Sequence, residues 1–348
     1  MKRYLASVFC GVFLFIGWTA TEANAQTAAA EAQAHVAKAR AVAYRPDHDI
    51  SDTFDSMCNP LKPNATQISG APSPGPTAPR SREPYAWYAA PAKVFDNLYY
   101  VGTSNQNNQS VWAVTTSDGI ILIDSAYDYT VKELVTNGLK KIGLDPAQIK
   151  YVILHHAHGD RYFGSKYLQD TYHARLIMSE ADWNVVAKSN DPAELKPRKD
   201  LVATDGMKLT LGDTTLTLYI TPGHTPGSLS TLVPLKDGNQ RHLGYMLGGR
   251  GAEMSDYGVS YFPDMATAMR TWIASIRRFH DIAQKAGADV FLSIHPQHDK
   301  TFNKLTALRF RKPGAPHPFV SKEFIENHVT VMTECMEAQL AWLMGRSN

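Results

Sequence analysis

Apolar residues along the chain fall into short segments that alternate between the spacing of strands and the spacing of helices. The runs 119–124 and 151–154 are apolar and of strand length, and residues 131–142 have helical spacing that ends at Gly143. Further strands are predicted at 93–102, 110–116, 214–221, 230–234 and 289–294, and a long helix at 265–286. Because strands and helices alternate in both halves of the chain, the pattern predicts an α/β layered domain.

The two ends of the chain have a different character. Residues 27–43 are rich in alanine with interspersed charges and predict a helix, whereas residues 59–84 are crowded with Pro, Ser, Gly and Thr and predict a linker or a surface arm. Residues 321–344 predict a C-terminal helix with one apolar face. We therefore expect an N-terminal helix and Pro-rich arm over 26–84 and a main domain over 85–348.

Residues 1–25 are typical of a secretory signal peptide. Two basic residues precede an apolar run over 5–18, and Ala23-Asn24-Ala25 forms a small-x-small cleavage site. The apolar run is shorter than the ~20 residues that a membrane-spanning helix needs. We expect cleavage after Ala25 and a periplasmic or secreted mature protein, with an uncleaved membrane anchor as the alternative.

Removal of residues 1–25 leaves two cysteines, Cys58 and Cys335. In an oxidising compartment an even pair predicts one disulfide, here between the start of the mature chain and its last helix. Two separate buried thiols are the alternative, because spacing alone does not establish pairing.

Composition narrows the classes of function. A hydrophobic content of 44% with 20% charged residues excludes an intrinsically disordered protein. The formal net charge of +2 gives no electrostatic footprint for nucleic acid or for an anionic membrane. We therefore expect a small-molecule substrate, no nucleic-acid partner and no membrane association after signal cleavage. The oligomeric state stays open.

A histidine cluster directly follows the predicted strand 151–154. In His156-Ala-His158-Gly-Asp160-Arg161, alternate residues of an extended segment point the same way, so two imidazoles can reach one metal ion with a carboxylate beside them. The alternative for this segment alone is a solvated turn.

Two further histidines also follow predicted strands. His224 lies in Thr-Pro-Gly-His-Thr-Pro-Gly after the strand 214–221, and His295 follows the strand 289–294. Loops at the carboxyl ends of strands that run alike meet at one edge of a sheet. The three loops together therefore predict a metal site rather than scattered structural histidines.

In this order, the three segments resemble the metallo-β-lactamase fold superfamily, over roughly Trp87 to His298. The resemblance implies a four-layered αβ/βα sandwich. It also implies a first zinc site formed by His156, His158 and His224. A second site would use Asp160, His295 and one further ligand, and Asp124 would support the metal loop without binding the ion.

The sequence departs from the family pattern at the further ligand of the second site. Family members commonly supply it as a histidine directly after the motif aspartate, or as an aspartate or cysteine in the later strand. Here these positions hold Arg161 and Arg250, or Gly249 if the later segment is shifted by one residue. A guanidinium has no lone pair to offer a cation and keeps its positive charge. We therefore predict one tightly bound zinc and a weak or empty second site.

A zinc ion held by three neutral imidazoles keeps a fourth position for water and can lower the pKa of that water to about 7. We expect the resulting metal-bound hydroxide to attack an acyl-type bond. Asp160 is the predicted group that orients this water or moves its proton, and His295 is the second candidate. We expect Arg161 to pair with Asp160, and we treat both Arg161 and Arg250 as candidates to receive an anionic substrate group.

The resemblance and the predicted export favour an exported zinc-dependent hydrolase with a β-lactam amide as the first candidate substrate. A lactone or ester hydrolase of the same fold is the alternative, and turnover of esters without turnover of β-lactams would distinguish it. A catalytically degenerate metal-binding or scaffold protein is a third hypothesis, which predicts metal binding without turnover.

Overall fold

The computed structural model describes residues 20–46, 48–59, 82–256 and 258–346. The predicted signal peptide up to position 19 and the Pro-rich arm over 60–81 lie outside these residues. Among the residues that are described, no helix has both the length and the apolar character that crossing a membrane requires.

The first sheet has seven strands in the order β3-β4-β5-β6-β7-β8-β9. Neighbours from β3 to β6 are antiparallel, and neighbours from β6 to β9 are parallel. Because β6 and β7 run alike, Asp124 after β6 and the histidine cluster after β7 emerge at the same edge. The strands are β3 (Ala92–Phe95), β4 (Leu98–Tyr100), β5 (Trp112–Thr116), β6 (Gly119–Ile123), β7 (Ile149–Ile153), β8 (Arg175–Ser179) and β9 (Leu201–Ala203).

The second sheet has five strands in the order β10-β11-β12-β13-β16. Its pairs are antiparallel except β13 with β16, which is parallel. Consequently β11, β13 and β16 run in the same direction, and the loops that follow them leave the sheet at one edge. The strands are β10 (Met207–Leu211), β11 (Thr214–Ile220), β12 (Leu229–Asp237), β13 (Gln240–Met246) and β16 (Val290–Leu292).

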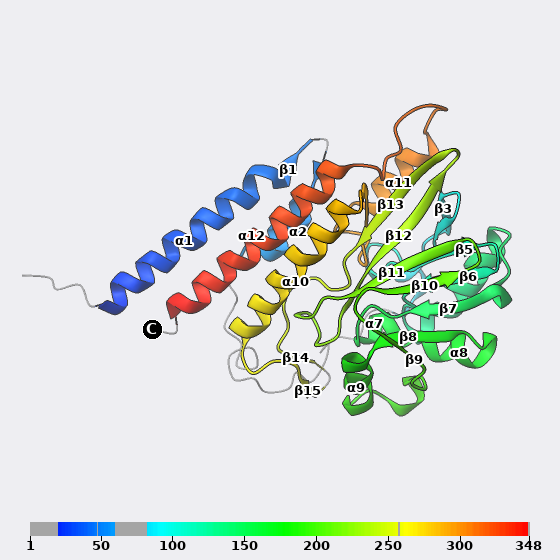
Figure 1. The fold of residues 1–348 in the computed structure, drawn as a ribbon, viewed down its shortest axis with the longest axis horizontal. Coiled ribbons are helices and arrows are strands. Elements are labelled where there is room, and N and C mark those ends of the chain that lie inside the picture. The colour runs from blue at the N-terminus through cyan, green and yellow to red at the C-terminus, as the bar shows by residue number, and fades with distance from the viewer. Residues whose placement is uncertain (1–19, 47, 60–81, 257, 347–348) are drawn as a thin grey trace, which may run out of the picture.

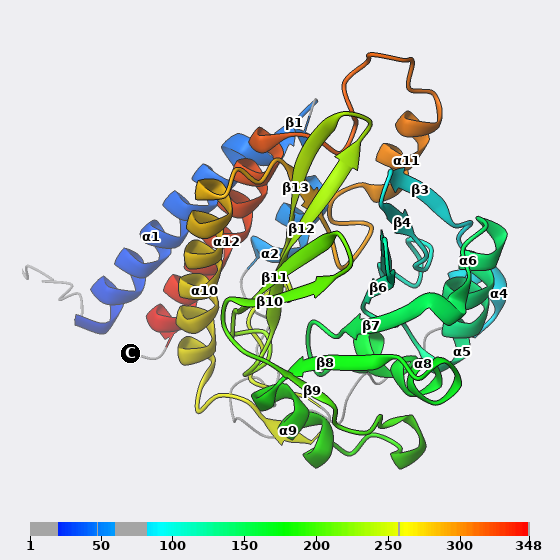
Figure 2. The same ribbon diagram turned by 45° about the vertical axis from the view of Figure 1, so that its right-hand side comes forward.

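The two sheets pack face to face, with helices outside each of them (Figures 1 and 2). Apolar side chains of both sheets, such as Ile121 and Val233, form one core cluster between them. A second cluster joins the outer face of the seven-stranded sheet to the helices between β6 and β9, and a third joins the other sheet to α10 (Met265–Lys285) and α12 (Lys322–Arg346). This order of helix, sheet, sheet and helix is the predicted αβ/βα sandwich, which is confirmed.

Further short helices and strands lie around the sandwich. They are β1 (Tyr44–Arg45), β2 (His48–Asp49), α4 (Pro84–Trp87), α5 (Asp128–Val131), the π-helix η1 (Lys132–Thr136), α6 (Asn137–Lys141), the 3-10 helix η2 (Pro146–Gln148), α7 (Gly159–Tyr162), α8 (Ser165–Tyr172), α9 (Glu180–Lys188), the 3-10 helix η3 (Ala193–Leu195), β14 (Ser255–Asp256), β15 (Val259–Ser260) and α11 (Thr301–Arg309).

Two predicted elements are divided in the structure. The strand predicted over 93–102 is broken into β3 and β4 by a turn at Asp96 and Asn97, two residue types that favour turns. The Asn97 side chain donates to the carbonyl of Pro234 at 2.9 Å and accepts from the Lys236 N–H at 2.9 Å, which ties the turn to the other sheet. The helix predicted over 131–142 contains the π-helical segment η1 between α5 and α6.

The N-terminal helix α1 (Ala20–Ala43) lies along α12, as both ribbon views show. Buried Ala32 contacts the buried alanines of α12, Ala338 and Ala341. Cys58, which follows α2 (Ser51–Met57), forms a disulfide with Cys335 on α12. The predicted disulfide is therefore confirmed, and it holds α2 against the C-terminal helix across a sequence separation of 277 residues.

Candidate metal centre

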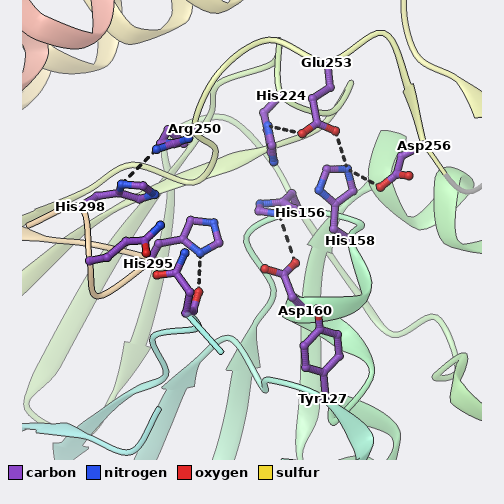
Figure 3. Close-up of a pocket in the computed structure, with 12 residues that line it drawn as sticks. Tyr127, His156, His158, Asp160, His224, Arg250, Glu253, Asp256, His295 and His298 are labelled. Atoms are coloured by element: carbon purple, nitrogen blue, oxygen red, sulfur yellow. Dashed lines mark hydrogen bonds and ion pairs between the residues drawn. The ribbon is translucent and has the colours of Figure 1, made fainter. Parts of the chain in front are cut away.

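The histidine-bearing loops meet in one pocket at the carboxyl edge of the two sheets (Figure 3). Its volume is about 300 Å³. The loop between β7 and α7 contributes His156 and His158, the loop after β11 contributes His224, and the loop after β16 contributes His295. The residues that line the pocket are Asn108, Tyr127, His156, His158, Asp160, His224, Arg250, Glu253, Asp256, His295, Gln297 and His298.

Three of these histidines are arranged to hold one metal ion. The rings of His156, His158 and His224 lie with centroids 4.5 to 4.7 Å apart, and one nitrogen from each lies within 4.8 Å of the others. The Nδ1 atom of His156 donates to the carbonyl of Gly248 at 2.6 Å, and that of His224 donates to the carbonyl of Gly251 at 3.1 Å. These bonds leave Nε2 of both rings as the ligand atoms, so the residues fit a zinc ion.

The close approach of the His224 loop to the segment after β13 requires glycine. A Cβ atom at Gly249 would lie 2.4 Å from Cβ of His224, and one at Gly248 would lie 1.4 Å from the carbonyl oxygen of Leu229. Side chains at these positions would displace either the metal ligand or the strand beside it.

Electrostatics keep two of the three rings neutral. Burial and the neighbouring imidazoles hold the pKa values of His156 and His224 well below their usual range. A neutral imidazole has the lone pair that a metal ion needs. For His158 burial also acts to lower the pKa, but the carboxylates of Glu253 and Asp256 outweigh it and raise the pKa. At His156 and His224, by contrast, the charge of Asp160 does not outweigh burial.

The two ligands expected for the second metal lie beside an arginine. Arg161 is fully buried, and its Nη2 lies 2.5 Å from a carboxylate oxygen of Asp160 and 3.4 Å from Nδ1 of His295. Desolvation acts to raise the pKa of Asp160, but the Arg161 charge outweighs it and holds this pKa well below the usual range. His295 donates from Nδ1 to the carbonyl of Asn108 at 2.6 Å. A fixed positive charge thus lies against both remaining donors.

Arg161 and Arg250, the two arginines at positions where the family commonly has a metal ligand, have different surroundings. Arg161 donates to the carbonyl of Ile294 at 2.8 Å and pairs with Asp124 at 3.2 Å, so its guanidinium is enclosed by protein and does not line the pocket. A substrate group cannot reach it in this position, and its pairing with Asp160 is the geometry expected for a loop-holding residue. Arg250 does line the pocket, where its Nη1 lies 3.0 Å from Nδ1 of His298.

Asp124 contacts His155, the residue directly before the two histidines of the β7–α7 loop. One carboxylate oxygen of this buried residue accepts from the N–H of His155 at 2.9 Å, and the other lies 3.1 Å from Nδ1 of the same ring. Nε2 of His155 lies 3.2 Å from the hydroxyl of Thr231. His155 therefore points away from the three metal-facing rings, while Asp124 holds the backbone from which they extend.

Sequence analysis missed two carboxylates in the pocket, Glu253 and Asp256. They follow β13, and each has an oxygen close to Nε2 of His158, at 3.4 Å for Glu253 and 3.5 Å for Asp256 (Figure 3). Desolvation and the neighbouring acidic groups raise the pKa of Glu253 to about 7. Their only signal in the sequence is that two acidic residues follow a strand of the same sheet, which is too common to identify a site.

Asp182 is a third missed residue and joins two of the metal-binding loops from behind. This buried residue in the first turn of α9 accepts from the N–H of Ala157, between two metal histidines, at 3.0 Å. It also accepts from the N–H of Gly227 at 2.8 Å and from the hydroxyl of Thr225, next to His224, at 2.6 Å. Burial raises the pKa of Asp182 to about 6.

We expect Asp182→Asn to weaken zinc binding by about 10- to 100-fold, as for other partners of metal ligands. The NH₂ group of the asparagine would face the N–H of either Ala157 or Gly227, and neither N–H can accept a hydrogen bond. One of the two loops would therefore lose its hydrogen bond to residue 182. Zinc affinity measured by competition with a chelating dye tests this, with Asp170→Asn on the exposed surface of α8 as the matched control. Equal zinc affinity in Asp182→Asn and in the unchanged protein would contradict the prediction.

Comparison with known proteins agrees with this geometry. Residues 105–237 match the family model described as the metallo-beta-lactamase superfamily. The structure is similar to the subclass B3 metallo-beta-lactamase BJP-1 of Bradyrhizobium japonicum, with 27% identity, a TM-score of 0.61, and coverage of 76% of this chain and 98% of that chain. It is also similar to a metallo-beta-lactamase of Cronobacter sakazakii with a HARLDQ motif, with 26% identity, a TM-score of 0.62, and coverage of 79% and 96%.

A third similar structure is a mutant of the metallo-beta-lactamase FEZ-1 from Legionella gormanii. It has 26% identity, a TM-score of 0.60, and coverage of 71% of this chain and 94% of that chain. The segment matched by the family model includes the histidine cluster and the His224 loop. Residues 105–237 thus match the model of the metallo-beta-lactamase superfamily, and the chain has the fold of known metallo-beta-lactamases.

Proposed function

We propose that this protein is an exported zinc-dependent hydrolase that binds one zinc ion tightly and cleaves an acyl-type bond, with a β-lactam amide as the first candidate substrate. The observation that carries the proposal is the convergence of His156, His158 and His224 in an open pocket. A zinc ion bound there would act as a Lewis acid and activate water for hydrolysis. The similar structures named as metallo-beta-lactamases support the choice of substrate.

The remaining pocket residues have proposed roles that follow from their positions. A carboxylate oxygen of Asp160 lies 3.9 Å from Nε2 of His156, on the metal-facing side of that ring, so Asp160 is placed to orient water or accept a proton. His295, which also lines the pocket, is the second candidate for proton transfer. Arg250 is the cation that lines the pocket, and it is the proposed partner of an anionic substrate group.

Export is proposed from the signal-like sequence of residues 1–25 and is compatible with the disulfide between Cys58 and Cys335. Such bonds persist mainly in oxidising compartments outside the cytosol.

Metal stoichiometry measured together with a hydrolysis panel tests the function. We expect one zinc per chain after extensive dialysis and turnover of β-lactams. Anionic members of the panel should be preferred over neutral ones because Arg250 faces the pocket. Turnover of lactones or esters alone would replace the substrate class, and metal binding without any turnover would favour a scaffold role. Two zinc ions retained per chain would contradict the proposed site.

We expect Arg161→His to increase occupancy of the second site. The substitution replaces a cation that repels a second zinc by an imidazole that can bind one, next to Asp160 and His295. The readout is zinc per chain by elemental analysis at a fixed free-zinc concentration, with Arg175→His on the surface as the control. Unchanged occupancy in Arg161→His would show that the surrounding geometry, rather than the missing ligand, limits the site.

A further inference from the structure

The metal-facing histidines His156, His158 and His224 are called the triad below. Residues 248–256 form one segment of the chain that contacts all three of them. The carbonyl of Gly248 accepts from His156 at 2.6 Å, and the carbonyl of Gly251 accepts from His224 at 3.1 Å. The third ring, His158, lies next to two carboxylates of the same segment, those of Glu253 and Asp256.

These carboxylates face Nε2 of His158, at 3.4 and 3.5 Å. A neutral imidazole has one N–H and one lone pair, so a ring whose Nε2–H faces a carboxylate keeps its lone pair on Nδ1. The contacts therefore select the tautomer in which Nδ1 of His158 is the metal ligand. In metalloproteins, a carboxylate on the far nitrogen of a ligating histidine also fixes the ring orientation and raises the basicity of the ligand.

Glu253 reaches a second ring of the triad. Its other carboxylate oxygen lies 3.7 Å from Nδ1 of His224, so a single side chain spans two metal ligands that come from different loops (Figure 3). Its backbone N–H donates to the carbonyl of Gly223 at 3.1 Å, directly before His224. The indole of Trp272 on α10 donates to the carbonyl of Gly249 at 3.1 Å. The segment is thus anchored on both the His224 loop and the outer helix.

We infer that Glu253, assisted by Asp256, is a positioning residue that orients His158 and His224 and sets the affinity of the triad for zinc. The inference rests on the proposed function, since it requires that the triad binds zinc. His158, Glu253 and Asp256 could also hold a cation of their own. With zinc bound in the triad as well, His158 would then have to bind one ion at each ring nitrogen, which differs from the arrangement inferred here.

The test uses the full mature chain, stripped of metal with a chelator and titrated with Zn²⁺ against a chelating dye. The variants are Glu253→Gln, Glu253→Asp and Asp256→Asn, with Glu194→Gln at an exposed position as the matched control. The cobalt(II)-substituted proteins supply a second readout, because the visible spectrum of cobalt reports the orientation and basicity of its ligands. The thermal midpoint of each metal-free variant shows whether it is folded.

We expect Glu253→Gln to weaken zinc affinity by about 10- to 100-fold and to shift the cobalt spectrum. Glu253→Asp, which keeps the charge, should recover part of the affinity, and the control should match the unchanged protein. Equal or tighter zinc binding in a folded Glu253→Gln would overturn the inference. Loss of one of two bound ions in that variant would also overturn it, by showing that Glu253 is itself a ligand. Failure of the unchanged protein to bind zinc would instead refute the proposed function.

Discussion

Replacing His156 by alanine is expected to abolish tight zinc binding and, with it, hydrolysis. The zinc triad has three protein ligands, and the zinc-binding free energies of ~10–16 kcal/mol known for protein sites are shared among few ligands. Loss of one ligand should therefore cost ~3–5 kcal/mol, or more than about 100-fold in affinity. Zinc titration and the rate of substrate hydrolysis are the two measurements.

A matched control for this substitution is His280→Ala. His280 lies on α10 with Nε2 at 3.1 Å from Glu326, away from the pocket, and alanine suits its helical position. This variant should keep both the zinc affinity and the rate. Full zinc affinity in a folded His156→Ala would refute the triad as the metal site.

Reducing the disulfide between Cys58 and Cys335 is expected to lower the free energy of unfolding substantially. The bond closes a loop with a sequence separation of 277 residues, and removal of a native disulfide costs ~2–5 kcal/mol. Thermal unfolding with and without reductant measures the effect. Cys58→Ser should reproduce the loss without reductant and should show no further change when reductant is added. An unchanged unfolding temperature after complete reduction would contradict the prediction.

Reduction of the disulfide should also weaken substrate binding in the pocket. The disulfide holds α2 in place, and the hydroxyl of Ser56 on α2 accepts a hydrogen bond from Arg250 at 3.0 Å. The reduced protein should therefore show a higher KM for an anionic substrate, at a temperature where it is still folded. Stability and substrate recognition are in this way linked through one short helix.

Local features of the sequence predicted a layered α/β domain and a metal site in the histidine-bearing loops, and the family resemblance implied the assignment of three histidines to one zinc ion. His156 and His158 alternate directly after an apolar strand, and His224 lies in a Pro-Gly-rich loop after another strand, so a few neighbouring residues identify each segment. The strand predicted over 93–102 was only partly right, because a turn interrupts it at Asp96 and Asn97, where side-chain contacts reach the other sheet.

The positions of Arg161 and Arg250 relative to the pocket could not be predicted from the neighbouring sequence. The adjacent Asp160 favoured an ion pair with Arg161, but the sequence did not decide which of the two arginines reaches the pocket. The structure buries Arg161 against Asp160 and Asp124, whereas Arg250 lies in the pocket beside His298. The difference arises because the loops after β6, β7 and β16 enclose Arg161, while the segment after β13 lies along the pocket wall.

The sequence by itself determined which side chains are candidate metal ligands, because histidines and an aspartate directly follow apolar strands. Only the tertiary structure decided what orients those ligands. Asp182 comes from α9, and Glu253 and Asp256 come from the segment after β13; no periodic pattern links either to the histidines. Their carboxylates reach the site because parallel strands and the packing of two sheets bring distant segments to one edge, and that proximity is a property of the folded chain alone.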